Sequence, residues 1–223
     1  MTVRNATSVV LAALVAGACA RSPAGGPDGL RVVPLGGEVR LIQDGDPVLL
    51  EEAEDVTSGD VVATGPLGRA RIELGVGRTV ELAPQAAVRV GGPTSAEVVE
   101  GSVLARAAVP TLSLRAGDAE ILGRDSVFRV DRGFSTTLAV YRGEAGLPGT
   151  GVAPVPQLRQ VTVLAGGSVP RGPRPLVVRP DDPWDARLLG PFIDLGLQLV
   201  DLQRGLSRQL APRDAAAAVK TVL

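Results

Sequence analysis

The side chains that could perform catalysis or bind a metal are few in this chain. Its 223 residues include no histidine, and its only cysteine and only lysine are Cys19 and Lys220. A nucleophile activated by histidine, an ordinary zinc site and an internal disulfide are therefore excluded. Paired carboxylates could hydrolyse sugars, but aromatic residues that stack on sugar rings make up only 2% of the chain. We expect no catalytic residue, no metal and no cofactor.

Cys19 is the residue whose surroundings indicate a specific chemistry. The apolar run Val9–Ala18 precedes it and is too short for a transmembrane helix, which needs about 20 residues. The run has the length of a signal-peptide core. Its last four residues, Val15–Ala18, resemble the lipobox of bacterial lipoproteins, with Ala16 where leucine or valine is usual. This resemblance implies that Cys19 is lipidated and becomes the new N-terminus.

The N-terminal region is thus predicted to contain a targeting signal and a flexible tether. We expect a signal peptide over residues 1–19 and a flexible segment over 20–30, because glycine and proline are frequent there. The protein is then extracytoplasmic and held at the membrane by the lipid on Cys19. An ordinary secretory signal, which gives a secreted protein, and a retained N-terminal anchor are the alternatives.

Composition narrows the class of the remaining chain. The net charge is −1 and no basic stripe with interleaved aromatics occurs, so we expect no nucleic-acid partner. Hydrophobic residues make up 45%, which indicates a folded core rather than disorder. Abundant valine, interrupted by 28 glycines and 18 prolines, favours short strands joined by tight turns.

Short apolar runs separated by turn residues continue over residues 31–178. They predict an all-β domain, an antiparallel sandwich or β-roll. Asp44-Gly45 predicts a tight hairpin between strands over 38–42 and 48–51. Further strands are expected at 69–74, 79–82, 87–90, 97–105, 111–114, 119–122, 126–130, 136–141, 158–164 and 176–178, with 146–156 as the longest interruption. A pattern of glycine, polar residue and apolar residue recurs along the chain. It begins at Gly37, Gly59, Gly101, Gly143 and Gly167, and it predicts turn glycines that start strands.

A different period begins near Asp181 and predicts an amphipathic helix over residues 181–211, followed by a tail over 212–223. Asp182 is the expected N-cap, Pro183 the first helical residue, and Trp184 an anchor of the helix start. Pro191 is expected to kink or split the helix. Large apolar residues then recur in alternating steps of four and three. They are Leu188, Phe192, Leu195, Leu199, Leu202 and Leu206.

This apolar stripe has two interpretations. It packs on its own β domain, which we prefer, or it binds a partner helix as a docking or dimerisation element. In the second case its residues are the partner-binding site.

Five short sequence motifs, distinct from the glycine pattern above, follow one another in the middle of the chain. They are 59–64 (Gly-Asp-Val-Val-Ala-Thr), 100–103 (Glu-Gly-Ser-Val), 126–130 (Ser-Val-Phe-Arg-Val), 140–145 (Val-Tyr-Arg-Gly-Glu-Ala) and 161–166 (Val-Thr-Val-Leu-Ala-Gly). In this order they resemble the FecR-type family of extracytoplasmic domains, over roughly residues 31–170. The sequence departs from the family at two turns, 74–77 and 124–125.

The resemblance implies a β-rich extracytoplasmic domain that contacts other proteins or envelope components. The resemblance implies the same kind of domain. It does not imply the pathway in which the founding members of the family act, which leads from a transporter to a sigma factor. The expected function is a non-catalytic interaction or sensory module anchored at the cell envelope. The alternative is a module that binds cell-wall polysaccharide through acidic residues and arginines on the sheet. The partner is accordingly an envelope protein or a polysaccharide.

Overall fold

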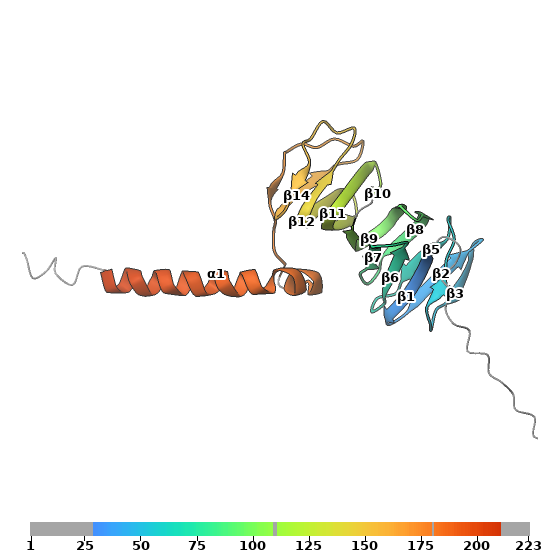
Figure 1. The fold of residues 1–223 in the computed structure, drawn as a ribbon, viewed down its shortest axis with the longest axis horizontal. Coiled ribbons are helices and arrows are strands. Elements are labelled where there is room, and N and C mark those ends of the chain that lie inside the picture. Colours follow the sequence, from blue (N-terminus) through green and yellow to red (C-terminus); the bar gives the residue numbers. More distant parts are fainter. Residues whose placement is uncertain (1–28, 109–110, 180, 211–223) are drawn as a thin grey trace, which may run out of the picture.

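The computed structural model describes residues 29–108, 111–179 and 181–210. The signal peptide, Cys19, nearly all of the tether and the tail lie outside these residues. Within them the predicted fold class is confirmed: strands form the body of the protein and a helix follows at its C-terminal end (Figure 1).

Within the described residues, fifteen strands form one connected set. In chain order they are β1 (Leu30–Gly36), β2 (Val39–Gln43), β3 (Asp46–Leu49), β4 (Glu54–Asp55), β5 (Val61–Thr64), β6 (Arg69–Leu74), β7 (Arg78–Leu82), β8 (Ala87–Gly92), β9 (Ser95–Ala107), β10 (Leu112–Ala116), β11 (Ala119–Arg132), β12 (Thr136–Gly146), β13 (Val155–Pro156), β14 (Arg159–Val163) and β15 (Arg174–Pro175).

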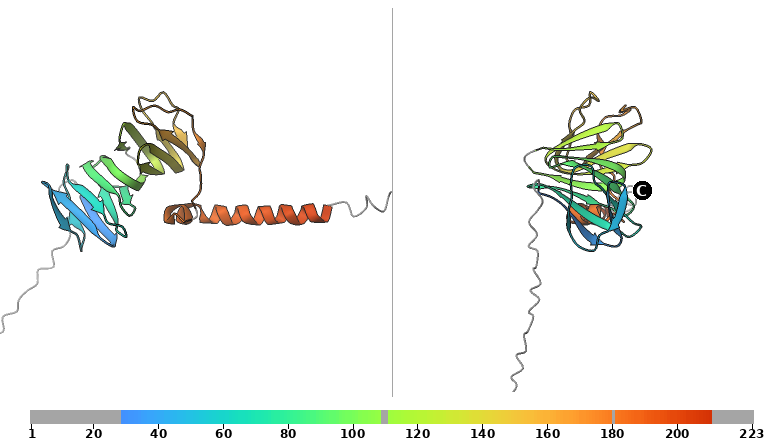
Figure 2. Two further views of the ribbon diagram at one scale, coloured as in Figure 1. Left: turned by 180° about the vertical axis from the view of Figure 1, so that it is seen from behind. Right: turned by 90° about the vertical axis from the view of Figure 1, so that its right-hand side faces the viewer.

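The strands are hydrogen-bonded in two rows. The first row runs β15-β14-β12-β11-β9-β7-β6-β1-β4, and the second runs β3-β2-β5-β8-β9-β10-β11-β12-β13. The long strands β9, β11 and β12 belong to both rows, so they join them. All pairs between described strands are antiparallel except β9 with β10, which is parallel. Figures 1 and 2 show the result as an elongated body, with β1–β3 at one end and β14 at the other.

Glycines allow the long strands to pass from one row to the other. In β9, Gly101 (φ 78°) separates the part that pairs with β8 from the part that pairs with β7. A Cβ atom there would lie 2.6 Å from the carbonyl oxygen of Gln85, which excludes larger residues. The prediction that turn glycines start strands is confirmed for Gly37 and Gly59, which precede β2 and β5. It is wrong for Gly101 and Gly143, which lie inside β9 and β12, and for Gly167, which no strand follows directly, although all five have a positive φ.

One aliphatic core lies between the rows. Alternation along each strand sends every second side chain into it: in β6, Ala70, Ile72 and Leu74 are fully buried while Arg71 and Glu73 are not. Residues of both rows join the same buried cluster. Each buried valine, leucine or isoleucine contributes about 1.5–3 kcal/mol relative to an exposed one, which is how a core almost without aromatics is stabilised.

Several strand predictions needed correction. The segments 119–122 and 126–130 are one strand, β11, with an irregular register near Asp125. No strand forms at 176–178; the last strand is β15, which pairs with β14. The predicted interruption over 146–156 contains the short strand β13. The hairpin between β2 and β3 is confirmed, with Asp44 and Gly45 at φ 53° and 96°.

The helix α1 (Pro183–Leu210) has 28 residues and begins where the sequence predicts. The Oδ1 atom of Asp182 accepts the backbone N–H groups of Trp184 (2.8 Å) and Asp185 (3.3 Å), so Asp182 is the N-cap. The helix continues through Pro191, so a split at this residue is wrong, and a kink there stays a prediction. Figure 1 shows its first turns beside the β domain and the remainder extending away from it. No described helix has a stretch long and apolar enough to cross a membrane.

Candidate functional site: the base of the C-terminal helix

The first turns of α1 cover one face of the sheet. Every second side chain of each strand points to this face, away from the core, and would be exposed to solvent without the helix. Glu81, Leu104 and Arg129 are direct neighbours across β7, β9 and β11. The residues on either side of each point into the core, so these three point to the opposite side, here called the outer face. Nevertheless only 4%, 0% and 1% of their surfaces are exposed. Something must therefore cover the outer face.

That cover is the apolar side of the helix base. Trp184 and Leu189 are only 2% and 4% exposed, and they form a second buried cluster with Leu104 and Tyr141 of the outer face. Leu188 packs against the same cluster. The prediction that Trp184 anchors the helix start is confirmed.

Arg129 holds the helix base by ion pairs. Its Nη1 atom donates to Asp182 Oδ2 at 2.8 Å and to Asp185 Oδ1 at 3.0 Å, and both acceptors belong to the helix start. Its Nε atom lies 3.3 Å from Asp131 Oδ2, on the same strand. Burial alone would lower the pKa of Arg129, but the neighbouring carboxylates, Asp131 foremost, raise it. The guanidinium is therefore a permanent buried cation.

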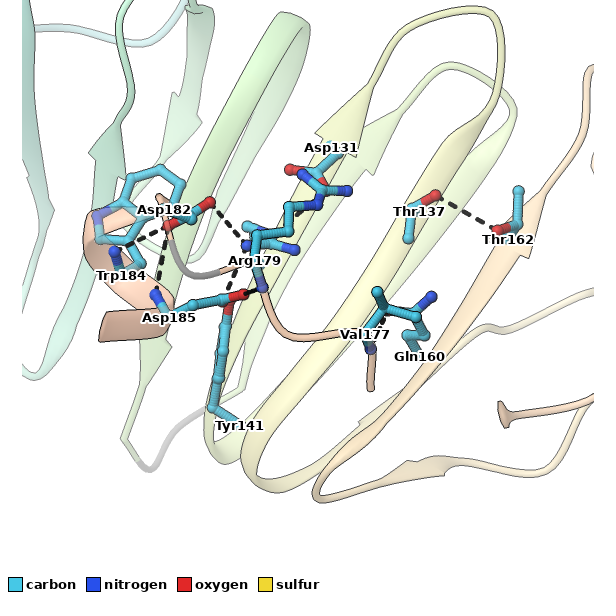
Figure 3. A network of polar contacts seen from close by, with 11 residues as sticks. Asp131, Thr137, Tyr141, Gln160, Thr162, Val177, Arg179, Asp182, Trp184 and Asp185 are labelled. Atoms are coloured by element: carbon cyan, nitrogen blue, oxygen red, sulfur yellow. Dashed lines mark hydrogen bonds and ion pairs between the residues drawn. The ribbon is translucent and has the colours of Figure 1, made fainter. Parts of the chain in front are cut away.

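Asp185 is the matching anion and is 0% exposed. Besides the ion pair with Arg129, Asp185 accepts a hydrogen bond from the hydroxyl of Tyr141. Its Oδ2 atom accepts another from the backbone N–H of Arg179 at 2.6 Å. Figure 3 shows Tyr141 reaching from the sheet to Asp185, and Arg179 on the segment that leads into the helix. Burial, and then the hydrogen bond to Asp185, raise the pKa of Tyr141, so this phenol stays a donor.

A second ionic group lies beside the first. Arg187 of α1 donates to Glu81 Oε2 at 2.9 Å, while Arg71 and Arg106 lie 3.4 and 3.9 Å from the other carboxylate oxygen. Burial alone would raise the pKa of Glu81, but the hydrogen bond from Arg187 and the charges of the three arginines hold it below its usual value. The carboxylate is thereby kept ionised under the helix.

These contacts make the site a fixed joint rather than a reactive centre. Each carboxylate named above is engaged by arginine, tyrosine or backbone donors, so none is placed as a general base. Among the described residues no group of three or more acidic, histidine or cysteine side chains could hold a metal ion. The arrangement can position a helix, and nothing in it points to bond-breaking chemistry.

The predicted partner-binding stripe divides between two surroundings. Leu188 packs on the β domain, whereas Leu195, Leu199 and Leu202 are 54%, 58% and 62% exposed. The side chains of Phe192 and Leu206 lie outside the described part of the structure. Self-packing is therefore correct for the helix base, and the exposed leucines remain available to a partner.

Sequence reasoning missed Arg129, Tyr141 and Asp185. The available signal was the apolar character of outward positions in alternating strands: Leu104 and Tyr141 stand where a wet face would carry polar residues. That signal indicates a covered outer face, although it does not identify the cover.

No protein-family model matches the sequence, and no curated protein matches it. Two crystal structures, at 2.50 and 1.65 Å resolution, of a "putative anti-sigma factor" from Parabacteroides distasonis ATCC 8503 are similar, each with a TM-score of 0.44 and 15% identity. The similarity covers 52% of this chain and spans 59% of that protein.

Proposed function

We propose that this chain is a non-catalytic interaction module of the cell envelope. A lipid on Cys19 holds it at the membrane outside the cytoplasm, and the projecting part of α1 binds a protein partner. That part, from Pro191 to Leu210, is here called the arm.

The observation that carries the proposal is the contrast between the two ends of α1. The base is fixed by buried ion pairs and by Trp184, but Leu195, Leu199 and Leu202 of the arm are more than half exposed. A helix that only completed its own core would bury these side chains and gain about 1.5–3 kcal/mol from each. Apolar side chains left exposed together are typical of interaction surfaces.

The chemistry of the arm favours a protein over a polysaccharide. A row of leucines is recognised by another apolar helix or by an apolar groove, through side chains three and four residues apart. Sugars require stacking aromatics beside hydrogen-bonding groups, and none of the described side chains of the arm is aromatic. The location rests on the lipobox-like segment before Cys19 and on the resemblance to FecR-type domains.

The envelope part of the proposal is tested by intact-mass spectrometry. Protein from the native membrane fraction is compared with a Cys19→Ala variant. A chain that begins at Cys19 and is heavier by at least a diacylglyceryl group, with the extra mass lost in the variant, is the expected result. An unmodified chain in the culture medium would exclude the lipid anchor.

The binding part is tested by photo-cross-linking in native membranes. A photoreactive amino acid is placed at Leu199, and in the matched control at Arg204, whose side chain is 71% exposed. We expect a protein adduct from position 199 and none from position 204. Equal adducts at both positions, or selective retention of the chain on purified cell wall, would contradict a protein-binding arm.

A further inference from the structure

We infer that the partner of the arm is a second copy of this chain, and that two arms pair in parallel. This inference rests on the proposed function, because it names the occupant of the exposed face. It follows from the spacing of the leucines, from the residues beside them, and from the position of the arm.

The spacing specifies a helical partner of the same period. From Leu188 to Leu206 six leucine or phenylalanine residues follow one another in alternating steps of four and three, which is the a and d pattern of a coiled coil. Other apolar residues of this span, Leu189, Ile193, Leu197 and Val200, occupy b, e and f positions. In this assignment Leu195 and Leu202 are d residues and Leu199 is an a residue. A globular groove does not require this alternation, whereas a second helix with the same seam does. A second copy carries that seam by definition.

The residues beside the seam can pair with the same residues of a second copy. Gln198 and Gln203 occupy the g and e positions that flank the leucines, and both are exposed. In a parallel pair, g of one helix faces e of the other five residues later, so Gln198 faces Gln203 of the second copy. A primary amide both donates and accepts, so two glutamines can pair with each other.

The charged residues of the arm stand away from this seam. Asp194, Asp201 and Arg208 occupy c positions and Arg204 occupies an f position. Asp201 and Arg204 lie 3.7 Å apart on the same helix. Self-pairing thus brings no like charges together, whereas a different partner is usually selected by charges at e and g.

The arm is also placed where a second helix can reach it. At about 1.5 Å per residue it is about 30 Å long. Figures 1 and 2 show it extending away from the β domain, and no described strand lies along it. The fixed base leaves the two β domains at the same end of a parallel pair.

The pairing is expected to be weak in solution, because the exposed seam is shorter than three heptads. Two lipid anchors in one membrane would raise the effective concentration of one arm around the other. Dimer formation should therefore depend on protein concentration.

Disulfide cross-linking tests the inference in the full-length chain that carries Cys19→Ala, so that an introduced cysteine is the only thiol. Leu195→Cys places a thiol at d, where the two copies meet in a parallel pair. Arg204→Cys places it at f, on the opposite side of the helix, as the matched control. Under mild oxidation we expect covalent dimers from Leu195→Cys and a loss of that product in Arg204→Cys.

Three outcomes would overturn the inference. Equal dimer yields from both variants would mean random collision, and no dimer from Leu195→Cys at any concentration would mean no parallel seam. Cross-linking only in a mixture of Leu195→Cys with Leu206→Cys would mean an antiparallel pair, in which the two Leu195 positions lie about 16 Å apart along the axis. An unchanged thermal unfolding curve for both variants shows that their folds are intact.

The two proposals can fail separately. A photo-adduct at Leu199 that contains a different protein, without any cross-linked pair of this chain, would keep the binding arm and reject the second copy. A missing adduct at Leu199 together with a missing Leu195→Cys dimer would reject both.

Discussion

Arg129 joins two parts of the chain that are far apart in sequence. It stands on β11, and its partner Asp185 is 56 residues further along, at the start of α1. Removing one member of a buried ion pair leaves the other charge without compensation. The arginine therefore sets how tightly α1 sits on the sheet.

We predict that Arg129→Met lowers the free energy of unfolding by about 3–5 kcal/mol, because Asp185 is then buried without its cation. The matched control is Arg142→Met, since Arg142 is 72% exposed and lies 3.6 Å from Asp125, which is 74% exposed. An exposed pair of that kind contributes about 0–1 kcal/mol. Urea unfolding of both variants measures the difference, and similar losses would show that the Arg129 network adds nothing to stability.

Glu81 gives the joint a dependence on pH. Its pKa is lower in the folded protein than the ordinary value of 4.5, so docking favours the ionised carboxylate. The stabilisation is present above pH 4.5 and is lost as the pH falls through the lowered pKa. Emission of the only tryptophan, Trp184, reports docking because this side chain of the helix base is buried against the sheet.

We predict that the Trp184 emission shifts to the red in acid, and that Glu81→Gln reduces this shift. The control is Glu97→Gln: the pKa of Glu97 is also lowered, against the effect of burial, but by Arg115 of β10 and Arg89 of β8 instead of by a residue of α1. The control should therefore leave the acid shift of the emission unchanged. An acid shift that Glu81→Gln does not alter would place the sensitivity elsewhere.

Only part of this site could be predicted at the residue scale. The cap Asp182 and the anchor Trp184 follow from neighbouring residues, because a helix start is a local feature. Arg129 lies in a strand whose apolar and polar residues alternate, and an arginine in such a strand ordinarily indicates the solvent-exposed face. Its burial depends on a helix that the chain reaches only some 50 residues later, so no local pattern contains it.

At the scale of elements, bends rather than lengths decide the architecture. Gly143 of β12 (φ 71°) lies so close to β11 that an added Cβ would be 2.3 Å from the carbonyl oxygen of Asp125. Gly149 has a similar φ of 80°, but nothing lies within 4 Å of its added Cβ. The two glycines thus separate the effect of backbone conformation from the effect of close packing.

We predict that Gly149→Ala costs about 1 kcal/mol, the penalty of a left-handed conformation. Gly143→Ala should cost about 3 kcal/mol or more, because the backbone of β11 must also move. Chemical denaturation of both variants measures these values. Equal costs would mean that the approach of β11 to β12 is not tight.

Most strands could be predicted because hairpins and alternation are local signals. The segment 69–74 was predicted with the bounds of β6, and Asp44-Gly45 fixed the first hairpin. The parallel pairing of β10 with β9, and the passage of β9 through both rows, could not be predicted. Both depend on contacts between segments that no short sequence window includes.

At the scale of the whole molecule, the β domain and the helix base form one folded body, and the arm adds nothing to it. We predict that a chain ending at Gly190 keeps its midpoint of thermal unfolding. A chain ending at Arg179 loses Trp184 and Asp185 and should be destabilised by about 3–5 kcal/mol. Thermal unfolding of both chains is measured at a protein concentration too low for two arms to pair, and a loss of stability in the longer one would then mean that the arm packs on the β domain.

The fixed joint has a mechanical consequence. The arm acts as a lever, and its base is held by residues of β7, β9, β11 and β12. Three of these strands run through both rows of the sheet. A load that reaches the helix base is therefore transmitted as torque to the whole β domain, because ion pairs and buried side chains fix the helix start.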